Sequence, residues 1–405
     1  MQLEDLDRWR DSFEAFHARF AHLFSRSESR EQAVKYLRGL LAPVERKNGW
    51  QVAEAVGDAT PDRMQRLLYR VDWDADAARD ILQAFVVEAF GHPDGIGVLD
   101  ETGFLKKGSH SVGVQRQYSG TAGKIENCQI GVFLTYSTPT GHVFLDRRLY
   151  LPEGWCDDAA RRTNAQVPRA VVFQTKPQQG IAMLEHAWAR GVPLRWVSGD
   201  EVYGDDPRLR EAVERQGCGY VLAVSSTTPV WRERPPVEEP RRATGGRPRL
   251  KVHLAPEALA ATSVATVVAG WSADQWQRFS VAEGEKGPRV YDWGRARVIE
   301  SRQQLPGPQV WLLARRSVSD PTDLAYYLVL APWETTLPEV AGVAATRYTV
   351  EQCIEEAKGE TGLDHYEVRH WSSWHRHITL SMLAHAWLAS IRSTAEVKGG
   401  HLLPS

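Results

Sequence analysis

Two aspartates each follow a short apolar run of the kind that forms a buried strand. Asp100 follows GIGVL and Asp200 follows LRWVSG. Residues at the carboxyl ends of adjacent strands in an α/β sheet point into a common crevice, where two carboxylates could hold a divalent cation. A single aspartate in such a place more often caps a turn or the next helix, and the presence of a pair is what favours a metal site.

Three further acids lie close in sequence to this pair, namely Glu101, Asp205 and Asp206. Asp206 directly precedes Pro207, and an aspartate before a proline is typical of a helix start. We therefore interpret Asp205 and Asp206 as structural residues.

A later segment, RYTVEQCIEEAKGE, places an acid between two bases. Arg347, Glu351 and Lys358 are spaced four and seven apart, so on a helix they share one face. A carboxylate can hold a divalent cation, while a guanidinium and an ammonium can hold phosphate oxygens. A solvated, salt-bridged face has the same spacing and is commoner, and Glu355, one turn from Glu351, competes for the acidic role.

The elements that must position these residues form a mixed pattern. Residues 1–90 show helical periodicity, residues 91–225 show strands followed by alternating helix and strand, residues 226–335 are β-rich, and residues 336–405 are helical. This order predicts a mixed α/β sheet covered by helices, with a β-rich insertion and an N-terminal helical region. Expected strands include 111–118, 129–136, 143–151, 194–198, 220–224, 265–271, 310–314 and 326–330, and expected helices include 177–189, 344–358 and 374–392.

Composition limits the class of protein. The 405 residues are 42% hydrophobic and 25% charged, as in globular proteins, and the formal net charge is -2, so nucleic acid would have to bind at local basic patches. Four widely spaced cysteines indicate neither a disulfide framework nor a thiolate zinc site. No signal peptide or membrane-spanning run is visible, and we expect a cytoplasmic, nucleoid-associated protein with no membrane partner.

Several long segments, in this order, resemble bacterial insertion-sequence transposases of the DDE superfamily, close to the IS701 group and related to the IS4 type. The resemblance covers most of residues 95–390 and is carried by VLDETGFLKKG, VGVQRQYSGTAGKIENCQIGVFL, WVSGDEVYGDDP, RYTVEQCIEEAKGETGLDHYEVRHW and RHITLSMLAHAWL. It implies an RNase H-like catalytic domain interrupted by the β-rich insertion. It also implies that Asp100, Asp200 and Glu351 are the catalytic and metal-binding triad.

The IS4-type signature consists of Tyr, two residues, Arg, three residues, Glu, six residues and Lys. Arg347, Glu351 and Lys358 satisfy its last three terms, which favours Glu351 over Glu355. The tyrosine term fails, because Ala344 occupies its place and Tyr348 stands next to the arginine.

What the resemblance implies is metal-dependent cleavage at the ends of an insertion sequence and strand transfer into target DNA. Two Mg²⁺ ions, which Mn²⁺ can replace, would promote the in-line attack of an oxygen on phosphorus. The partners would be the terminal inverted repeats and target DNA, with a homodimer on DNA because two ends are cut in concert. The N-terminal helices are our candidate for recognition of those ends.

Basic residues at two places could contact DNA. Near the first acid we expect phosphate contacts from Lys106, Lys107, Arg116 and Lys124, in addition to Arg347 and Lys358, although a solvated loop fits the first four as well. The loop 241–251 is a stronger basic patch, with Arg241, Arg242, Arg247 and Arg249, although such runs often only aid solubility.

Two other functions share these features: a catalytically silent DNA-binding regulator derived from a transposase, and a metal-dependent nuclease without strand transfer. The late histidines, including His375, His377 and His385, are interpreted as packing and surface residues and not as a metal site. Trp371 and Trp374 could stack on bases, but core packing is the default for each.

Overall fold

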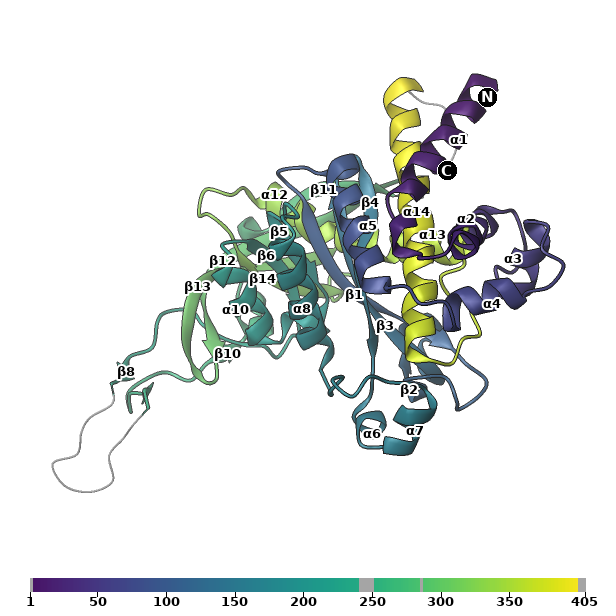
Figure 1. The fold of residues 1–405 in the computed structure, drawn as a ribbon. Helices are drawn as coiled ribbons and strands as arrows, with labels where there is room; N and C mark the ends of the chain where they lie inside the picture. The colour runs from purple at the N-terminus through teal and green to yellow at the C-terminus, as the bar shows by residue number, and fades with distance from the viewer. Residues whose placement is uncertain (1–2, 240–250, 285–286, 400–405) are drawn as a thin grey trace. The chain divides into compact units, whose positions relative to one another are not determined.

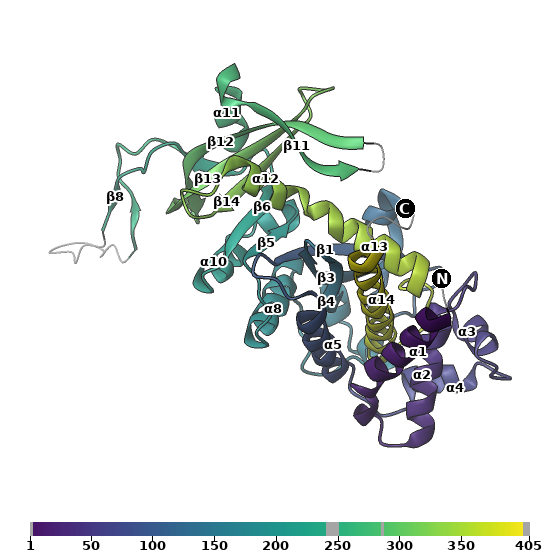
Figure 2. The same cartoon turned by 90° about the horizontal axis from the view of Figure 1, so that it is seen from above.

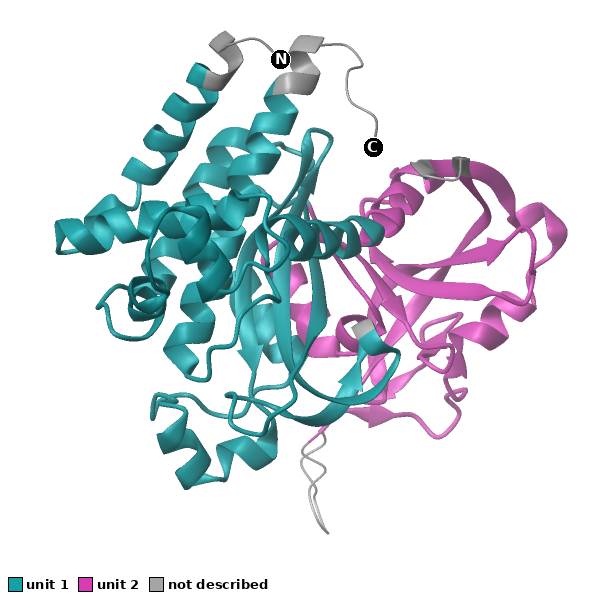
Figure 3. Cartoon of the chain, turned by 90° about the vertical axis from the view of Figure 1, so that its right-hand side faces the viewer, with its two compact units in different colours: residues 1–195, 348–405 teal, residues 196–347 magenta. Residues whose placement is uncertain are grey.

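The computed structural model describes residues 3–239, 251–284 and 287–399. The chain forms two compact units, one of residues 1–195 with 348–405 and one of residues 196–347 (Figure 3). Residues 91–225, expected as one part of a catalytic domain, therefore contribute to both units.

Helices fill the N-terminal part of the first unit (Figure 1). Asn48 and Asp74 start two of them, since each side chain accepts hydrogen bonds from backbone amides of the first turn. Phe13 of the first helix packs edge-on against Trp387 near the chain's end, with ring centroids 5.3 Å apart. The helices are α1 (Leu3–Ala18), α2 (Ser27–Leu41), α3 (Gly49–Ala55), α4 (Asp62–Tyr69) and α5 (Ala75–Phe90).

The sheet of the first unit is antiparallel and is built around one long strand. β3 (Lys124–Thr138) pairs with β1 (Ile96–Leu105), β2 (Gln115–Ser119) and β4 (Gly141–Tyr150). Its central residues, from Cys128 to Tyr136, are buried without interruption, as expected for a strand covered on both faces.

Helices cover this sheet. α5 and α14 (Trp371–Gly399) pack on β4, and α8 (Lys176–Ala189) packs on β3 and β4 (Figure 2). Glutamine side chains from two of these helices also bond to the backbone of β4: Gln83 donates to the Leu145 carbonyl and Gln179 to the Leu149 carbonyl, each at 3.2 Å. The remaining helices are α6 (Glu153–Cys156), α7 (Ala159–Asn164) and α13 (Arg347–Thr361), which begins at the last residue of the second unit.

The second unit is also built on paired strands. β5 (Trp196–Gly199) and β6 (Gly219–Val224) run parallel, and antiparallel pairing continues from β6 to β14 (Leu324–Leu330), β13 (Leu305–Ser317) and β12 (Gly287–Arg302). β12 also pairs with β11 (Gln277–Gly284) and β7 (Pro229–Trp231), and β7 with β10 (Thr262–Ser263). A separate ladder joins β8 (Val237–Glu238) and β9 (His253–Leu254).

Short helices complete the second unit: α9 (Glu201–Gly204), α10 (Pro207–Arg215), α11 (Val264–Ala269) and α12 (Leu337–Ala345), which lies on β6 and β11 (Figure 2). The strand predicted at 265–271 is wrong, because this segment contains α11. The Ser263 side chain caps it by accepting from the Thr266 amide at 3.1 Å, which outweighs the strand preference of its valines.

The helix expected at 344–358 is also divided. α12 ends at Ala345 and α13 begins at Arg347, with Thr346 between them. The Gly342 carbonyl accepts hydrogen bonds from both the Thr346 hydroxyl, at 3.0 Å, and the Thr346 amide, at 3.1 Å. The mixed α/β class predicted from the sequence is confirmed.

Candidate functional site

Asp100 lies within β1 and not at its end. The ladder to β3 continues past it, from Asp100 opposite Phe133 to Leu105 opposite Cys128. The predicted strand-end position is therefore wrong, because the pairing partner extends the strand where the apolar run stops. The partly exposed Asp100 carboxylate accepts a hydrogen bond from the Glu101 amide at 2.7 Å.

Glu101 faces the opposite side of the sheet from Asp100, because successive strand residues alternate. Its carboxylate forms an ion pair with Lys176, the first residue of α8. This pair joins β1 to a helix that packs on the same sheet, so Glu101 has a structural role.

The late helix α13 is attached to the Asp100 side of β1. Lys358 donates a hydrogen bond from Nζ to the Thr102 hydroxyl at 2.8 Å, and Thr102, two residues beyond Asp100, shares its face. Burial lowers the pKa of Lys358, and Asp364 and Glu355 partly oppose that effect. The structure thus brings the segment around Asp100 and Thr102 into contact with the segment around Lys358, which lies 256 positions after Thr102 in the chain.

The acids of α13 differ in their surroundings. Glu351 and Glu355 are exposed, whereas Glu356 contacts His142 and His385 and pairs with Arg392. Burial raises the pKa of Glu356, but the interactions with His142 and His385 outweigh that effect and hold the pKa well below its usual range. Glu356 is therefore a structural acid, and Glu351 lies two turns before Lys358 on the same helix face.

Asp200 belongs to the second unit, where it follows β5 and caps α9. Its carboxylate accepts from the Val202 amide at 3.0 Å. Gly204, at the end of the same short helix, lies so close to the Ala223 carbonyl that any Cβ would collide with it. This close approach of α9 to β6 fixes the turn that carries Asp200.

The neighbouring acids are structural, as predicted. Asp206 caps α10 by accepting from the Arg208 amide at 2.8 Å, and Asp205 accepts from the Ser225 amide at 3.1 Å and the Thr228 hydroxyl at 2.8 Å. The two bonds to Asp205 tie the junction of α9 and α10 to the start of the loop that follows β6.

The donor chemistry of the predicted triad suits a hard cation, since Asp100, Asp200 and Glu351 are all partly or fully exposed carboxylates. Asp100 and Glu351 are in the first unit and Asp200 is in the second. Within the described residues, no three histidine, cysteine or acidic side chains form a ready-made metal cluster. The triad stays a prediction.

The predicted phosphate contacts have different environments. Lys106 is largely buried: its Nζ lies 3.6 Å from the centre of the Tyr366 ring and donates to the Tyr366 carbonyl at 2.9 Å. Burial lowers its pKa to about 8. Lys107, Arg116 and Lys124 are exposed, and Arg347 is partly exposed. Arg241, Arg242, Arg247 and Arg249 lie outside the described residues.

His377 and Trp374 are packing residues, as expected for the late histidines and tryptophans. His377 is buried and bonded to the Tyr36 hydroxyl at 2.8 Å and the Gly362 carbonyl at 3.0 Å. Trp374 is buried and donates to the Tyr366 hydroxyl at 3.0 Å, which excludes a base-stacking role for it in this conformation. The four cysteines are unpaired, as predicted.

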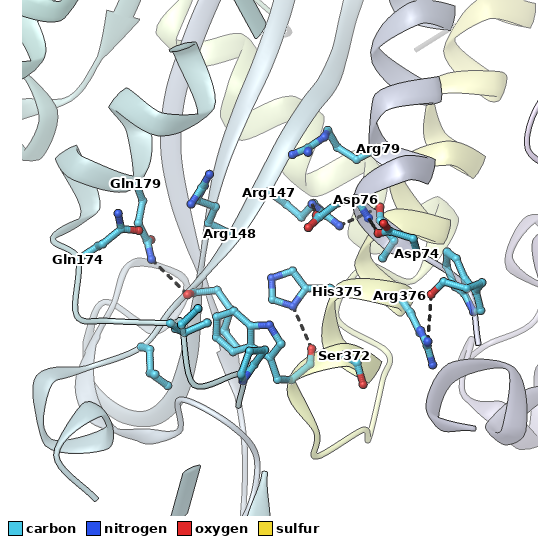
Figure 4. A pocket seen from close by; sticks show the side chains of 18 of the residues that line it. Asp74, Asp76, Arg79, Arg147, Arg148, Gln174, Gln179, Ser372, His375 and Arg376 are labelled. Carbon is cyan, nitrogen blue, oxygen red and sulfur yellow. Dashed lines mark hydrogen bonds and ion pairs between the residues drawn. The ribbon is translucent and has the colours of Figure 1, made fainter. Parts of the chain in front are cut away.

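A basic pocket in the first unit was not predicted. Arg147 and Arg148, adjacent in β4, line it together with Arg79, His375 and Arg376 (Figure 4). The sequence contained a signal: the run DRR interrupts the otherwise apolar strand GHVFLDRRLYLP. Charges inside a covered strand need partners, so they mark either an ion-pair network or a binding site.

No helix among the described residues has the length and apolar character that crossing a membrane requires.

The sequence is similar to those of known proteins. Residues 19–288 match the model of a family described as "DDE superfamily endonuclease". The chain is 25% identical over 198 residues to the "Probable transposase for insertion sequence element IS701" of Microchaete diplosiphon, which covers 48% of this chain and 49% of that protein. The match thus spans about half of the relative's length.

Among solved structures, one that resembles the chain is the cryo-EM structure of a piggyBac transposase synaptic complex with hairpin DNA. The TM-score is 0.45 and the sequence identity 9%, over 94% of this chain and 69% of that one.

Proposed function

Because the chain belongs to the DDE superfamily of endonucleases, we propose that it is a transposase that cuts DNA at the ends of an insertion sequence and joins them to target DNA. The observation that carries this proposal is the bond from Lys358 to Thr102. It attaches the helix of the Arg-Glu-Lys signature to the strand that holds Asp100. The named relative, a probable IS701 transposase, supports the same assignment.

In this proposal the catalytic domain is RNase H-like, and Asp100, Asp200 and Glu351 supply the oxygen ligands for two Mg²⁺ ions, which Mn²⁺ can replace. Such ions, when bound, lower the barrier to in-line attack at phosphorus by activating the attacking oxygen and stabilising the leaving one. The protein itself provides no nucleophile, so the attacking group is water for cleavage and a DNA 3′-hydroxyl for joining.

The basic residues hold the substrate. Lys358, whose ammonium is fixed by Thr102, and Arg347, one turn before Glu351, contact phosphates near the scissile bond. Lys106, Lys107, Arg116 and Lys124 contact the backbone further along, and the loop with Arg241, Arg242, Arg247 and Arg249 adds a basic patch. Helices α1–α5 recognise the terminal repeats, and two copies of the chain act together on the two ends.

The test uses a plasmid that carries the gene's own flanking DNA, the purified full chain and Mg²⁺, with EDTA as the metal-free control. Two matched pairs of variants separate catalysis from folding. Asp200→Asn and Asp206→Asn both keep a good helix cap, because asparagine caps as well as aspartate. Glu351→Gln and Glu355→Gln both alter an exposed acid of α13.

We expect metal-dependent cleavage at the borders that Asp200→Asn and Glu351→Gln abolish and that Asp206→Asn and Glu355→Gln leave intact. Joined products establish the transposase. Cleavage without joining would identify a nuclease, and border binding without cutting would identify a DNA-binding regulator. Loss of cleavage in Glu355→Gln with activity retained in Glu351→Gln would move the acidic role to Glu355.

A further inference from the structure

The basic pocket of the first unit has a volume of about 760 Å³ and lies entirely within that unit (Figure 4). Its walls come from β4, the starts of α5 and α14, the start of α8 and the loop at 168–174. Small-molecule sites have volumes of this order, about 300–1,000 Å³. None of the predicted metal ligands, and none of the basic residues predicted to contact DNA phosphates, lines it.

Two of the pocket's arginines are paired. Arg79 donates to Asp146 at 2.7 Å. Arg147 donates to Asp76 at 2.8 Å, to the Thr379 hydroxyl at 2.9 Å and to the Ala75 carbonyl at 3.0 Å. These bonds join β4 to α5 and α14, so both arginines have a structural role.

The charge at the far end of the pocket is also balanced. Arg376 donates to the carbonyls of Leu68 and Trp73 at 3.1 and 3.0 Å, and the nearby carboxylates of Asp72 and Asp74 attract it. Little positive charge is therefore left at this end.

Arg148 is different. It follows Arg147 in β4, so its side chain leaves the opposite face of the strand. Its Nε is buried with no hydrogen-bond partner, and among the described residues no carboxylate lies within ion-pair distance of its guanidinium. Burial lowers its pKa, and the carboxylate of Asp146, beyond ion-pair distance, partly opposes that effect; an arginine remains protonated at any physiological pH.

The Arg148 side chain is partly exposed, but its Nε is buried and no carboxylate in the described part of the chain contacts its guanidinium; a cation removed from water in this way is costly unless a ligand supplies the anion. In Figure 4 the Arg148 side chain projects into the pocket between Gln179 and Arg147. The planar guanidinium carries two terminal nitrogens side by side, which match two oxygens of a phosphate group.

The rest of the pocket suits the organic part of such a ligand. Gln179 Oε1 is buried without a partner, and Trp371 offers an aromatic wall beside the apolar Val171 and Leu149. His375 is neutral, since burial lowers its pKa to about 3. Its Nδ1 lies 2.9 Å from the Trp371 carbonyl, so Nδ1 carries the proton and Nε2 is an acceptor.

We propose that this pocket binds the phosphate group of a nucleotide, with Arg148 as the cation that contacts it and the apolar and amide walls holding the nucleoside. The nucleotide is either free in solution or part of a DNA strand, since both present the same chemistry. The inference does not rest on the proposed transposase activity, and its test reads binding and not cleavage.

The experiment measures binding of deoxyadenosine monophosphate to the full chain by calorimetry, in EDTA, with inorganic phosphate and deoxyadenosine as partial ligands. We expect the nucleotide to bind more tightly than either part, and Arg148→Gln to weaken it about 10- to 100-fold. Arg190→Gln, an exposed change at the end of α8, is the control.

A second pair of variants keeps the test decisive even where Arg148→Gln does not fold. Val172 lies at the pocket wall and is 66% exposed. Val172→Glu adds a negative charge at the rim and should weaken nucleotide binding, whereas Val172→Gln, of similar size, should not. The thermal unfolding midpoint of each variant without ligand serves as the folding control.

Adding a DNA duplex to the complex of protein and nucleotide shows whether the pocket takes a free nucleotide or part of a DNA strand. Displacement of the nucleotide, with duplex affinity lowered in Arg148→Gln, indicates a DNA strand. Retention of the nucleotide indicates a free one. If inorganic phosphate binds as tightly as the nucleotide, or if neither nucleotide nor duplex affinity responds to Arg148→Gln and Val172→Glu, the proposal is overturned.

Discussion

Lys358 and Thr102 are joined by a hydrogen bond of 2.8 Å although 256 positions separate them in the chain. The bond holds an ammonium group, whose pKa burial lowers, on the face of β1 that carries Asp100. A lysine held in this way is already oriented before a substrate arrives, which is the condition for strong electrostatic stabilisation of a transition state.

Lys358→Met should lower DNA cleavage about 100-fold, as removal of one oriented charge-stabilising group often does. Stability should not fall, because methionine keeps the stem's packing and removes a charge that burial disfavours. Cleavage assays and thermal unfolding check this. Thr102→Ser, which keeps the hydroxyl, should retain activity that Thr102→Val loses, and equal activity in the two would contradict the positioning role.

Replacing the two adjacent arginines of β4 should have different effects on the free energy of unfolding. Arg147→Met removes a buried partner of Asp76 and of the Thr379 hydroxyl and should cost about 3 kcal/mol of unfolding free energy. Arg148→Met removes a cation that has no carboxylate at ion-pair distance in the described structure, so stability should stay the same or rise. Urea unfolding of both variants measures the difference, and a large loss in Arg148→Met would refute the contrast.

Acid should destabilise the protein through its buried histidines. Burial lowers the pKa of His377 to about 4 from an ordinary 6.5, so the folded protein keeps it neutral while the unfolded chain takes up a proton below pH 6.5. Stability present above pH 6.5 is therefore lost as the pH falls towards 4, by up to about 3 kcal/mol for this group. Burial acts in the same direction on His17 and His375.

Urea unfolding at pH 7 and pH 5 measures this loss. His377→Gln can still accept from Tyr36 and donate to Gly362, and it should show a smaller difference between the two pH values. An unchanged difference would mean that His377 does not carry the proton uptake.

DNA binding should weaken as the pH rises through about 8, where Lys106 loses its charge. Its ammonium attracts phosphate only below that pH, and the nearby Asp364 and Glu367 already raise its pKa against the effect of burial. Binding isotherms between pH 7 and pH 9 test this. Lys106→Arg stays charged throughout and should flatten the profile.

Local patterns predicted much of this molecule. The Asp206-Pro207 pair marks the start of α10, and the apolar runs at 220–224 and 326–330 are strands of the second unit. These features depend on residues within a few positions of one another. The strand predicted for the valine-rich segment 265–271 is wrong because one capping bond, from the Thr266 amide to the Ser263 side chain, favours a helix there.

What could not be predicted depends on distant partners. β1 continues past Asp100 because β3 pairs with it, and the apolar pattern of the sequence does not predict that pairing. The unequal surroundings of Arg147 and Arg148 follow from Asp76 and Thr379, which reach β4 from two different helices. Spacing alone also left Glu351 and Glu355 equivalent, and both are exposed on α13.

The glutamine bonds to β4 have a consequence for self-assembly. An outer strand with vacant carbonyls is a template on which a second chain can add its own strand, and it is a common origin of aggregates. Gln83 and Gln179 already occupy the carbonyls of Leu145 and Leu149, so an incoming strand would have to displace two amides that α5 and α8 hold in place. Copies of this protein that meet at high concentration are thus hindered from joining their sheets through β4.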